Sequence, residues 1–579
     1  MGVINKNKGE KCMKILNVKK ERAITLVVLV ITIVLLLILA GISISILTNI
    51  GFFGRTKEAK EKSKIAQEQE KILLTEYEDE LGKYTDNDRW DGKVNKPELM
   101  EGMTAIQFSD PTENTEGSIK KVEDINKDEW YNYDIKKWAN AQTEDGSMWV
   151  WIPRYAYKII YNDPNDKSKG GISDIVFLIG TTDNYIDANG NLQTAKRQTD
   201  KNQVIETDST KTNKYTVHPA FTNESKIGYA NGGWNKEVTG IWIAKFEAGY
   251  ASGNNKASVQ ASSINYTATV GWVAGAETGS NASGQSARNY LDGIYGSTQT
   301  SIKYPTFQGT TYSMNYINNN DAYNISRHLT EEDNIYGFNK NITDSHLMKN
   351  SEWGMVDYLS ESKYGLNGTK IYLNNVDLNN SKQSVYAVTG CASSEIDAKE
   401  TVKTTIDDIN NRTVKNVYVW NQKNGTKAST TGTIYGIYDM AGGTSEKMAA
   451  YIQNNNAVLT KNGNALITAA ERSQYVMTYP FDLSFDNKNF SNLFTVSKAN
   501  YNKNTKIYGD AIRETSKLGT WDALSWYDTT WSLYPALNNP FFHRGGNIVD
   551  MNSCGLFIFA WNPGGSDYSV GFRCALVKI

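Results

Sequence analysis

Hydrophobic and polar positions follow three patterns along this chain, and each pattern predicts a different kind of structure. Residues 23–47 form an unbroken apolar run that contains no charged side chain. Residues 55–84 are rich in strong helix formers, with opposite charges four residues apart, as in Lys57 and Glu61, and only a thin apolar stripe. After residue 84, short apolar and aromatic runs alternate with clusters of Asn, Gly, Asp, Ser and Thr, which is typical of short strands joined by turns. The sequence therefore predicts an apolar helix, a solvated helical stalk and a strand-rich body.

The apolar run is long enough to cross a membrane. As a helix rising about 1.5 Å per residue it spans roughly 37 Å, against a hydrocarbon core of about 30 Å. The leader before it, residues 1–22, carries the basic side chains Lys6, Lys8, Lys11, Lys14, Lys19, Lys20 and Arg22 against Glu10 and Glu21. By the positive-inside rule the leader stays in the cytoplasm and everything after Leu47 is exported. We therefore expect a single-pass helix at 23–47 followed by a stalk at 48–84.

A cleaved secretory signal is the alternative interpretation of this segment. Its apolar region is usually about 7–15 residues long and ends at an A-x-A site. The run at 23–47 is longer and lacks such an exit. The expected location is thus the cell membrane, with the body outside the cell.

Residues 19–26 read KKERAITL and combine basic side chains with a small residue and a hydrophobic-Thr-Leu sequence. This segment resembles the leader of type IV prepilins. The resemblance implies processing between Ala23 and Ile24, although Ala23 stands where the family usually has Gly. Val28 stands where the family's helix usually carries the Glu that sets register during assembly. The resemblance therefore implies a pilin-like anchor, and it leaves assembly into a bulk pilus in doubt.

The body is predicted to be α+β, with many short strands and few helices. The runs at 148–152 and 240–247 predict strands, and DANGN at 187–191 predicts a turn. Helices are expected at 344–364, at 443–451 and near 465–472. No repeat of about 20–50 residues is visible, which argues against a solenoid or a propeller. We divide the body into a β-rich part, 85–235, and a domain, 236–579.

Composition excludes several classes of protein. At 579 residues the chain is long enough for two to four domains of about 150 residues. Its 61 Lys and Arg balance 63 Asp and Glu, so nucleic acid is not an expected partner, because phosphate binding needs a local basic excess. Four cysteines are too few for a disulfide scaffold in a chain of this length. The 34 Tyr, 14 Trp and 46 Gly are typical of turn-rich β structure and of adaptable binding surfaces.

Five short sequences in the body resemble one family, in the family's order. They are GIWIAKFE at 240–247, SEW at 351–353, GIYDMAG at 436–442 followed by Glu446, FFHRGG at 541–546 and VGFRC at 570–574. They are similar to the conserved segments of formylglycine-generating-enzyme-like domains, also called sulfatase-modifying-factor domains. The resemblance implies a C-type-lectin-like fold of the formylglycine-generating-enzyme type.

The region 544–573 also resembles the variable region of proteins diversified by retroelements. In those proteins fixed glycines and aromatic residues hold the backbone while neighbouring positions change to alter ligand choice. The resemblance implies a scaffold of Gly545, Gly546, Gly555, Phe557, Phe559 and Gly571. It implies these ligand-facing positions: Asn547, Ile548, Val549, Asp550, Asn552, Ile558, Ala560, Asn562, Ser566, Asp567 and Tyr568. The alternative is an ordinary Asn- and Gly-rich terminal hairpin.

The resemblance does not extend to catalysis. The family's oxidases bind copper with two cysteines shortly after the RGG sequence, whereas here that interval holds only Cys554. Soft thiolate ligands are what select Cu(I), so one thiol predicts a non-catalytic relative. Asp439 and Glu446 fall in the segment that holds calcium in some relatives, which leaves a structural calcium open. No phosphate-binding loop, HExxH helix or G-x-S-x-G elbow is present, and no other cofactor is expected.

The remaining reactive and aromatic residues have structural interpretations. Cys574 could pair with Cys391 or Cys554, but buried free thiols are the default. Each histidine is expected to be structural, namely His218, His328, His346 and His543. Of the aromatic residues, Trp521 is expected in the core and Trp531 and Tyr534 at a ligand-binding surface. Those expected to pack are Trp130, Tyr131, Tyr133 and Trp138.

These observations favour a cell-surface display protein, anchored by 23–47, that binds an extracellular protein or glycan. The first alternative is a minor pilin or pseudopilin whose partners are pilus or secretion-system subunits. The second alternative is a formylglycine-generating oxidase-like enzyme.

Overall fold

The computed structural model describes most of the chain from residue 89 onward. The residues outside the description are 1–88, 126–128, 198–214, 224–231, 251–268, 271–303, 316, 375–386, 394–402, 405–413, 416, 470–473, 485–492, 505–507, 520–521, 527–528, 548–553 and 566–568. The leader, apolar helix and stalk expected over 1–84, with the processing site at Ala23 and Ile24, therefore lie outside the described residues. The described residues, from 89 onward, belong to one compact unit. Within the described part, no helix combines the length and the apolar character needed to cross a membrane.

Seven antiparallel strands from distant parts of the chain form the main sheet, in the order β14-β27-β10-β4-β3-β1-β2. Their bounds are β1 Thr104–Phe108, β2 Ile119–Lys121, β3 Asn140–Gln142, β4 Met148–Pro153, β10 Gly240–Ala244, β14 Thr343–Leu347 and β27 Cys574–Lys578. Every residue of β4 and β10 is buried, as unbroken apolar strands require when both faces are covered. The strands expected at 148–152 and 240–247 are therefore confirmed, the second ending at Ala244. The parts expected at 85–235 and 236–579 both contribute strands to this sheet.

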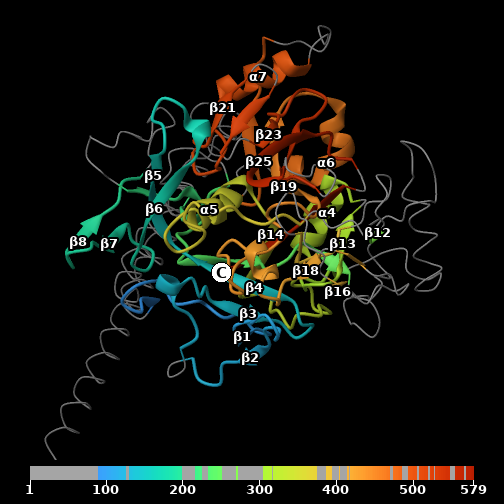
Figure 1. Ribbon diagram of the computed structural model, residues 1–579. Helices are drawn as coiled ribbons and strands as arrows, with labels where there is room; N and C mark the ends of the chain where they lie inside the picture. The colour runs from blue at the N-terminus through green and yellow to red at the C-terminus, as the bar shows by residue number, and fades with distance from the viewer. Residues whose placement is uncertain are drawn as a thin grey trace, which may run out of the picture. The chain divides into compact units, whose positions relative to one another are not determined.

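A second sheet lies beside helices α6 and α7 (Figure 1). Its order is β20-β19-β24-β25, with β26 also paired to β19. The bounds are β19 Ser445–Gln453, β20 Met477–Pro480, β24 Phe541–Gly545, β25 Gly555–Asn562 and β26 Val570–Phe572. The helix expected at 443–451 is wrong, because this segment is strand β19. Its Glu, Lys, Met and Ala residues are good helix formers, but pairing with β20, β24 and β26 outweighs that weak preference.

The helix expected at 344–364 is two elements. Residues 343–347 form β14, which pairs along its whole length with β27, and the helix α5 follows at Asn350–Ser360. The side chain of Glu352 accepts a hydrogen bond from the Lys349 backbone N–H at 2.9 Å, which satisfies one free donor at the start of α5. All residues of α5 are buried, including Trp353. The helix expected near 465–472 is confirmed as α6, Ala457–Ala469, with the remainder of that range outside the described residues.

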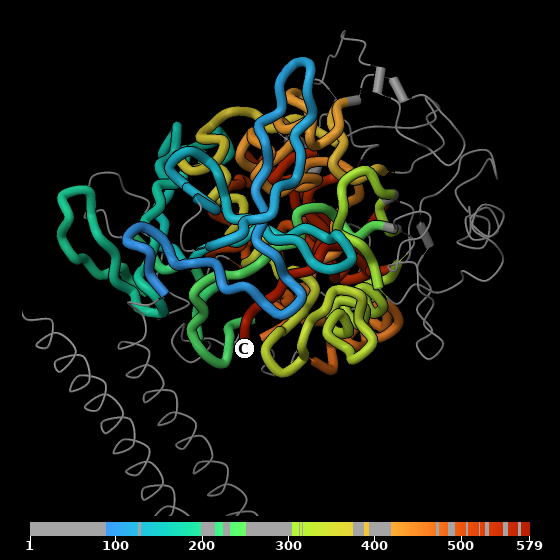
Figure 2. Tube along the Cα trace, turned by 90° about the horizontal axis from the view of Figure 1, so that it is seen from below, coloured from blue at the N-terminus to red at the C-terminus, as the bar shows by residue number. Residues whose placement is uncertain are grey.

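Three smaller strands and a hairpin form one flank of the body. The sheet β6-β5-β9 contains β5 Tyr155–Tyr161, β6 Gly171–Phe177 and β9 Thr216–Val217, and β6 is an edge strand. The hairpin of β7 Asn184–Ile186 and β8 Leu192–Thr194 projects from the body in both Figure 1 and Figure 2. Its turn confirms the prediction at 187–191: Asp187 Oδ1 accepts the N–H groups of Asn189 and Asn191, each at 2.9 Å.

The other elements are short. They are β11 Gly249–Tyr250, β12 Thr269–Val270, β13 Tyr312–Asn315, α4 Asn319–Arg327, β15 Cys391–Ser393, β16 Lys403–Thr404, β17 Val414–Lys415, β18 Val417–Val419, α7 Leu493–Lys503, β21 Ser516–Leu518, β22 Ala523–Ser525 and β23 Thr529–Ser532, with 3₁₀ turns η1 Tyr133–Ile135, η2 Lys167–Lys169, η3 Pro219–Phe221 and η6 Gly425–Ala428. The described chain is thus α+β, rich in strands and poor in helices, as the sequence predicts. Trp130, Tyr133 and Trp138 are buried and Tyr131 packs half-buried against them, which confirms their packing role.

Candidate ligand-binding site

Arg573, in the GFRC sequence, is fully buried and draws three of the family-like segments together. Its Nη1 donates to the carbonyl of Ala244 and its Nη2 to the carbonyl of Tyr438, each at 2.8 Å. Both carboxylate oxygens of Glu446 accept from the same guanidinium at 2.5–3.0 Å. The strand β10, the segment around Tyr438 and the end of the chain therefore meet at one side chain.

Arg544, in the RGG sequence, links the other two segments. Its Nε donates to the carbonyl of Ile558 at 2.8 Å, and its Nη2 lies 3.3 Å from Asp357 Oδ2 on α5. On the same helix, Trp353 Nε1 donates to the carbonyl of Leu556 at 2.8 Å. The two arginines of the family-like motifs thus hold the core together and are closed to external ligands.

Three buried carboxylates surround Arg573. Burial, followed by the charges of Asp439 and Glu446, raises the pKa of Glu247 well above its ordinary value. Burial also raises the pKa of Asp439 to about 6, against the opposing effect of Arg573. Among the described residues, Glu247 Oε2 has no hydrogen-bond partner, which fits a carboxyl that keeps its proton.

Asp439 and Glu446 do not fit the calcium site left open by the sequence. Calcium takes about six to eight oxygen ligands. Here Glu446 faces the guanidinium of Arg573, and Asp439 accepts hydrogen bonds from Asn374 Nδ2 at 2.8 Å and from the Gly390 N–H at 2.9 Å. A cation in this position would have to displace an arginine that three segments share. The described residues contain no cluster of three or more acidic, His or Cys side chains arranged to hold a metal.

The three described cysteines are buried free thiols, so neither pairing proposed for Cys574 is formed. The Sγ of Cys554 donates to the carbonyl of Asn547 at 2.9 Å, and that of Cys574 donates to Ser326 Oγ at 3.2 Å. Burial raises the pKa of the Cys574 thiol to about 12, so this cysteine stays a neutral thiol at neutral pH.

The histidines occupy contrasting environments. His218 is fully buried in the core and His543 is half-buried on β24, and burial lowers the pKa of each to about 3. His346 instead lies between two carboxylates, 3.2 Å from Asp344 and 3.0 Å from Glu352, and its pKa is raised by these partners against the effect of burial. His328, the fourth, is partly exposed and lies 3.6 Å from Glu331.

The structure places few of the predicted ligand-facing residues at the surface. Tyr534 is 2% exposed and packs against Tyr479 and Phe542, so the surface position expected for it is wrong. Asn547, Ile558 and Asn562 are also buried, while Ala560 is half-buried. The predicted positions outside the described residues are Ile548, Val549, Asp550, Asn552, Ser566, Asp567 and Tyr568. The side chain of Trp531 and the whole of Trp521 are likewise outside the description.

The residues expected to form the scaffold of region 544–573 have the burial and backbone conformation that a scaffold needs. Phe557 and Phe559 are buried. Gly545 and Gly546 have φ values of +84° and +74°, in the region that favours glycine. A Cβ at Gly571 would lie 2.3 Å from Thr444 Oγ1, so this position has no space for a side chain.

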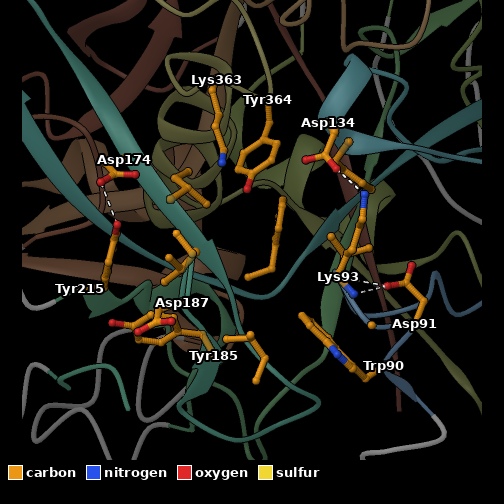
Figure 3. Close-up of a pocket in the computed structure, with 18 of the residues that line it drawn as sticks. Trp90, Asp91, Lys93, Asp134, Asp174, Tyr185, Asp187, Tyr215, Lys363 and Tyr364 are labelled. Atoms are coloured by element: carbon orange, nitrogen blue, oxygen red, sulfur yellow. Dashed lines mark hydrogen bonds and ion pairs between the residues drawn. The ribbon is translucent and has the colours of Figure 1, made fainter. Parts of the chain in front are cut away.

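A cavity of about 900 Å³ lies in a different part of the body, where no site was predicted (Figure 3). Segments far apart in the sequence line it: 90–94, 131–134, the edge strand β6 at 174–177, the β7–β8 hairpin and Tyr215, and 363–364 after α5. In Figure 3, Lys363 and Tyr364 lie above the cavity and Trp90 below it, with Asp174 and Tyr215 on one side and Asp134 on the other.

Aromatic rings form much of the cavity wall. They are Trp90, Tyr131, Tyr133, Phe177, Tyr185, Tyr215 and Tyr364. The rings contact one another, with centroids 4.7 Å apart for Phe177 and Tyr364 and 5.4 Å apart for Tyr133 and Phe177. Such mutual packing holds the rings in place, so the cavity offers rigid contact area at low cost in conformational entropy.

The polar groups of the wall are mainly acidic. Asp91, Asp134, Asp174 and Asp187 line the cavity, against Lys93 and Lys363. Lys93 Nζ lies 2.5 Å from Asp134 Oδ2, and this hydrogen bond is the main cause that raises the pKa of Lys93. Backbone hydrogen bonds, that from Asn191 first, lower the pKa of Asp187. The cavity therefore presents carboxylates next to aromatic faces.

Sequence reasoning missed this cavity because its residues do not form a motif. Of the lining segments, the sequence singled out only the aromatic group at 130–138 and the turn at 187–191, and it predicted a structural role for both. Comparison with known proteins adds no assignment, since no protein-family model and no curated protein matches the chain.

Proposed function

We propose that this chain is a non-catalytic, ligand-binding protein of the adhesin or receptor type, displayed at the cell surface. The observation that carries the proposal is the 900 Å³ cavity with its rigid aromatic and acidic wall. Binding pockets have this character, with packed apolar surface and a few convergent polar groups.

The arrangement of the core supports a C-type-lectin-like fold of the formylglycine-generating-enzyme type. Arg573 joins three of the family-like sequences, those at 240–247, 436–446 and 570–574, and Arg544 joins the RGG sequence to α5, which carries the SEW sequence. Residues that recur together in a family for structural reasons are expected to meet in this way. Cys554, the thiol that lies shortly after the RGG sequence, is buried, which supports a scaffold that has no oxidase chemistry.

The N-terminal sequence supports surface display. In this proposal 23–47 anchors the chain in the membrane, 48–84 lifts the body away from it, and processing between Ala23 and Ile24 provides a pilin-like entry to the surface. The terminal region 544–573 remains a proposed second binding surface, restricted now to Ala560 and the predicted positions outside the described residues.

The proposal is tested with the full chain expressed in a bacterial host. Intact cells are treated with a membrane-impermeant biotin reagent, and the purified full chain in an uncharged detergent is applied to arrays of extracellular proteins and glycans. We expect labelling of the body in intact cells and saturable binding to a defined set of array members. Protection of the body from the reagent would contradict surface display. Copper-dependent oxidation of a cysteine-containing peptide by the purified chain would contradict the non-catalytic assignment.

A further inference from the structure

The acidic wall of the cavity is only partly neutralised. Among the described residues, Lys93 pairs with Asp134 and Lys158 pairs with Asp174, at 2.5 and 3.0 Å. No described Lys or Arg forms an ion pair with the other two lining carboxylates, Asp91 and Asp187. Because unpaired carboxylates attract positive charge, a cationic group is the complementary ligand.

The aromatic wall already binds ammonium groups from within the protein. Lys363 Nζ lies 4.9 Å from the centroid of the Tyr364 ring, and Lys158 Nζ lies 4.7 Å from that of Tyr215. Both distances fall within the roughly 6 Å range of cation–π attraction. The rings of Trp90, Tyr131 and Tyr185 belong to the same wall and offer further faces of this kind.

One side of the cavity is lined by β6, an edge strand whose residues Ile175 and Phe177 are 2% and 6% exposed. Four consecutive residues of β6, Asp174–Phe177, line the cavity, although successive side chains of a strand point to opposite faces. The cavity must therefore follow the strand edge. On that edge the Ser173 N–H donates away from β5 to the Glu361 carbonyl at 3.1 Å. By the alternation of a strand, the backbone groups of Ile175 and Phe177 point the same way, and no described strand pairs with them.

The rim of the cavity has exposed apolar side chains. Ile186 and Leu192 face each other across the β7–β8 hairpin and are 43% and 61% exposed. Ile186 lines the cavity and Leu192 lies next to Gln193, which also lines it. A free strand edge beside aromatic, acidic and apolar groups is the arrangement that accepts an added peptide strand.

We propose that this cavity binds an extended segment of a partner protein that carries lysine or arginine side chains alternating with apolar ones. The segment adds to the edge of β6, its cationic groups contact Asp91, Asp187 and the aromatic faces, and its apolar groups contact Ile186 and Leu192. This inference deepens the proposed function by naming the class of ligand. A neutral glycan, which would use the aromatic faces but not the surplus charge, is the competing occupant.

The test uses the full chain in an uncharged detergent and fluorescein-labelled six-residue peptides with blocked ends. The probe alternates Lys and Val, and the matched peptides replace Lys with Gln or with Glu. We expect the Lys peptide to bind at least about tenfold more tightly than the Gln peptide, with an affinity that falls as salt rises. Methylating alternate backbone nitrogens of the Lys peptide is expected to abolish binding, because it blocks the strand edge.

Variants locate the site. Asp91→Asn with Asp187→Asn keeps the Oδ1 atoms that cap both turns and removes both charges, and we expect about a tenfold loss of affinity for the Lys peptide. Because it also removes the acceptor of the Tyr131 hydroxyl, Tyr131→Phe is measured beside it and should bind as the wild type does. Trp90→Ala is expected to weaken binding severalfold. Asp163→Asn is the matched control: Asp163 Oδ1 accepts the N–H of Asn165 at 2.9 Å, as Asp187 does for Asn189, but Asp163 does not line the cavity. This control should bind as the wild type does, and each variant is checked for an unchanged urea midpoint.

The outcomes of these binding experiments distinguish a peptide site from a glycan site. Equal affinity for the Lys and Gln peptides, or unchanged binding by the Asp91→Asn, Asp187→Asn variant, would overturn the inference. Binding of cellohexaose that Trp90→Ala abolishes, without peptide binding, would make the cavity a glycan site, overturning the inference but leaving the proposed function intact. Failure of every probe to bind overturns the inference alone, since the surface-labelling and array experiments test the proposed function separately.

Discussion

The Arg573 guanidinium and the Glu446 carboxylate form a fully buried ion pair, with Nη2 and Oε1 2.5 Å apart. Because Glu247 and Asp439 lie in the same buried cluster, Arg573 is the cation that permits several acidic groups to share the core. We expect removal of one partner to lower the free energy of unfolding.

Arg573→Met should lower the free energy of unfolding by about 3–5 kcal/mol, because it leaves Glu446 buried without its counter-charge. The measurement is urea unfolding of the full chain, followed by tryptophan fluorescence. Adding Glu446→Gln to this variant should recover part of the loss. Arg89→Met, which removes an exposed pair with Glu98 at 3.9 Å, should change stability by less than about 1 kcal/mol. A loss no greater for Arg573→Met than for Arg89→Met would contradict this role.

Gly546→Ala should destabilise the protein by more than Gly190→Ala. Both glycines have positive φ, +74° and +80°. A Cβ at Gly190 meets nothing within 4 Å, whereas one at Gly546 lies 3.0 Å from both Cα and Sγ of Cys554. Gly190→Ala should therefore cost only the backbone strain of about 1–2 kcal/mol, and Gly546→Ala should cost more because it adds steric contact. Thermal unfolding of both variants under one condition measures the difference.

Glu514→Gln should remove a pH dependence of stability. Burial raises the pKa of Glu514 to about 7, and its carboxylate oxygens contact the hydroxyls of Tyr157 and Tyr358, both at 2.7 Å. Since the unfolded pKa of Glu is about 4.3, the native state retains the proton more firmly. The stability that this proton provides is complete below about pH 4 and is lost as pH rises through 7, by about 4 kcal/mol.

The measurement compares urea unfolding of the wild type and Glu514→Gln between pH 4.5 and 8. The difference between the two curves isolates Glu514 from the other buried acids, such as Asp510. Parallel curves over this range would show that Glu514 is not the titrating group.

Tyr534→Phe should leave stability unchanged or raise it by up to about 1 kcal/mol, because the Tyr534 hydroxyl is buried and has no hydrogen-bond partner among the described residues. Tyr155→Phe is the matched comparison: that hydroxyl donates to the Met355 carbonyl at 2.6 Å, and its loss should cost about 1 kcal/mol. Unfolding midpoints of both variants test the contrast, and a larger loss for Tyr534→Phe would contradict it.

The parts of the fold that local sequence could predict are those where one interaction dominates. The runs at 148–152 and 240–247 are rich in Trp, Ile and Val, so they predicted strands, and the structure shows that β4 and β10 are buried throughout. The turn at Asp187 follows from Asp, Asn and Gly chemistry within five residues. Both features depend on neighbours in sequence, and both are confirmed.

The features that were predicted wrongly or missed depend on contacts between residues that are distant in sequence. The segment 445–453 contains good helix formers, and only its pairing with three distant strands makes it extended. Tyr534 lies in a short run, WSLYPAL, with no helix or strand period to show which side chains face inward, and its burial depends on Tyr479 and Phe542. The cavity brings together residues from Trp90 to Tyr364, and no local pattern reports such convergence.

The position of β27 between β10 and β14 has a consequence for biosynthesis. Residues 574–578 fill an interior place in the main sheet, and both neighbouring strands are made long before them. Until these residues emerge, β10 and β14 each present an unpaired edge of the kind that promotes aggregation. A truncated product that ends before Cys574 therefore lacks the strand between β10 and β14. The main sheet of such a product is interrupted, and its core cannot close.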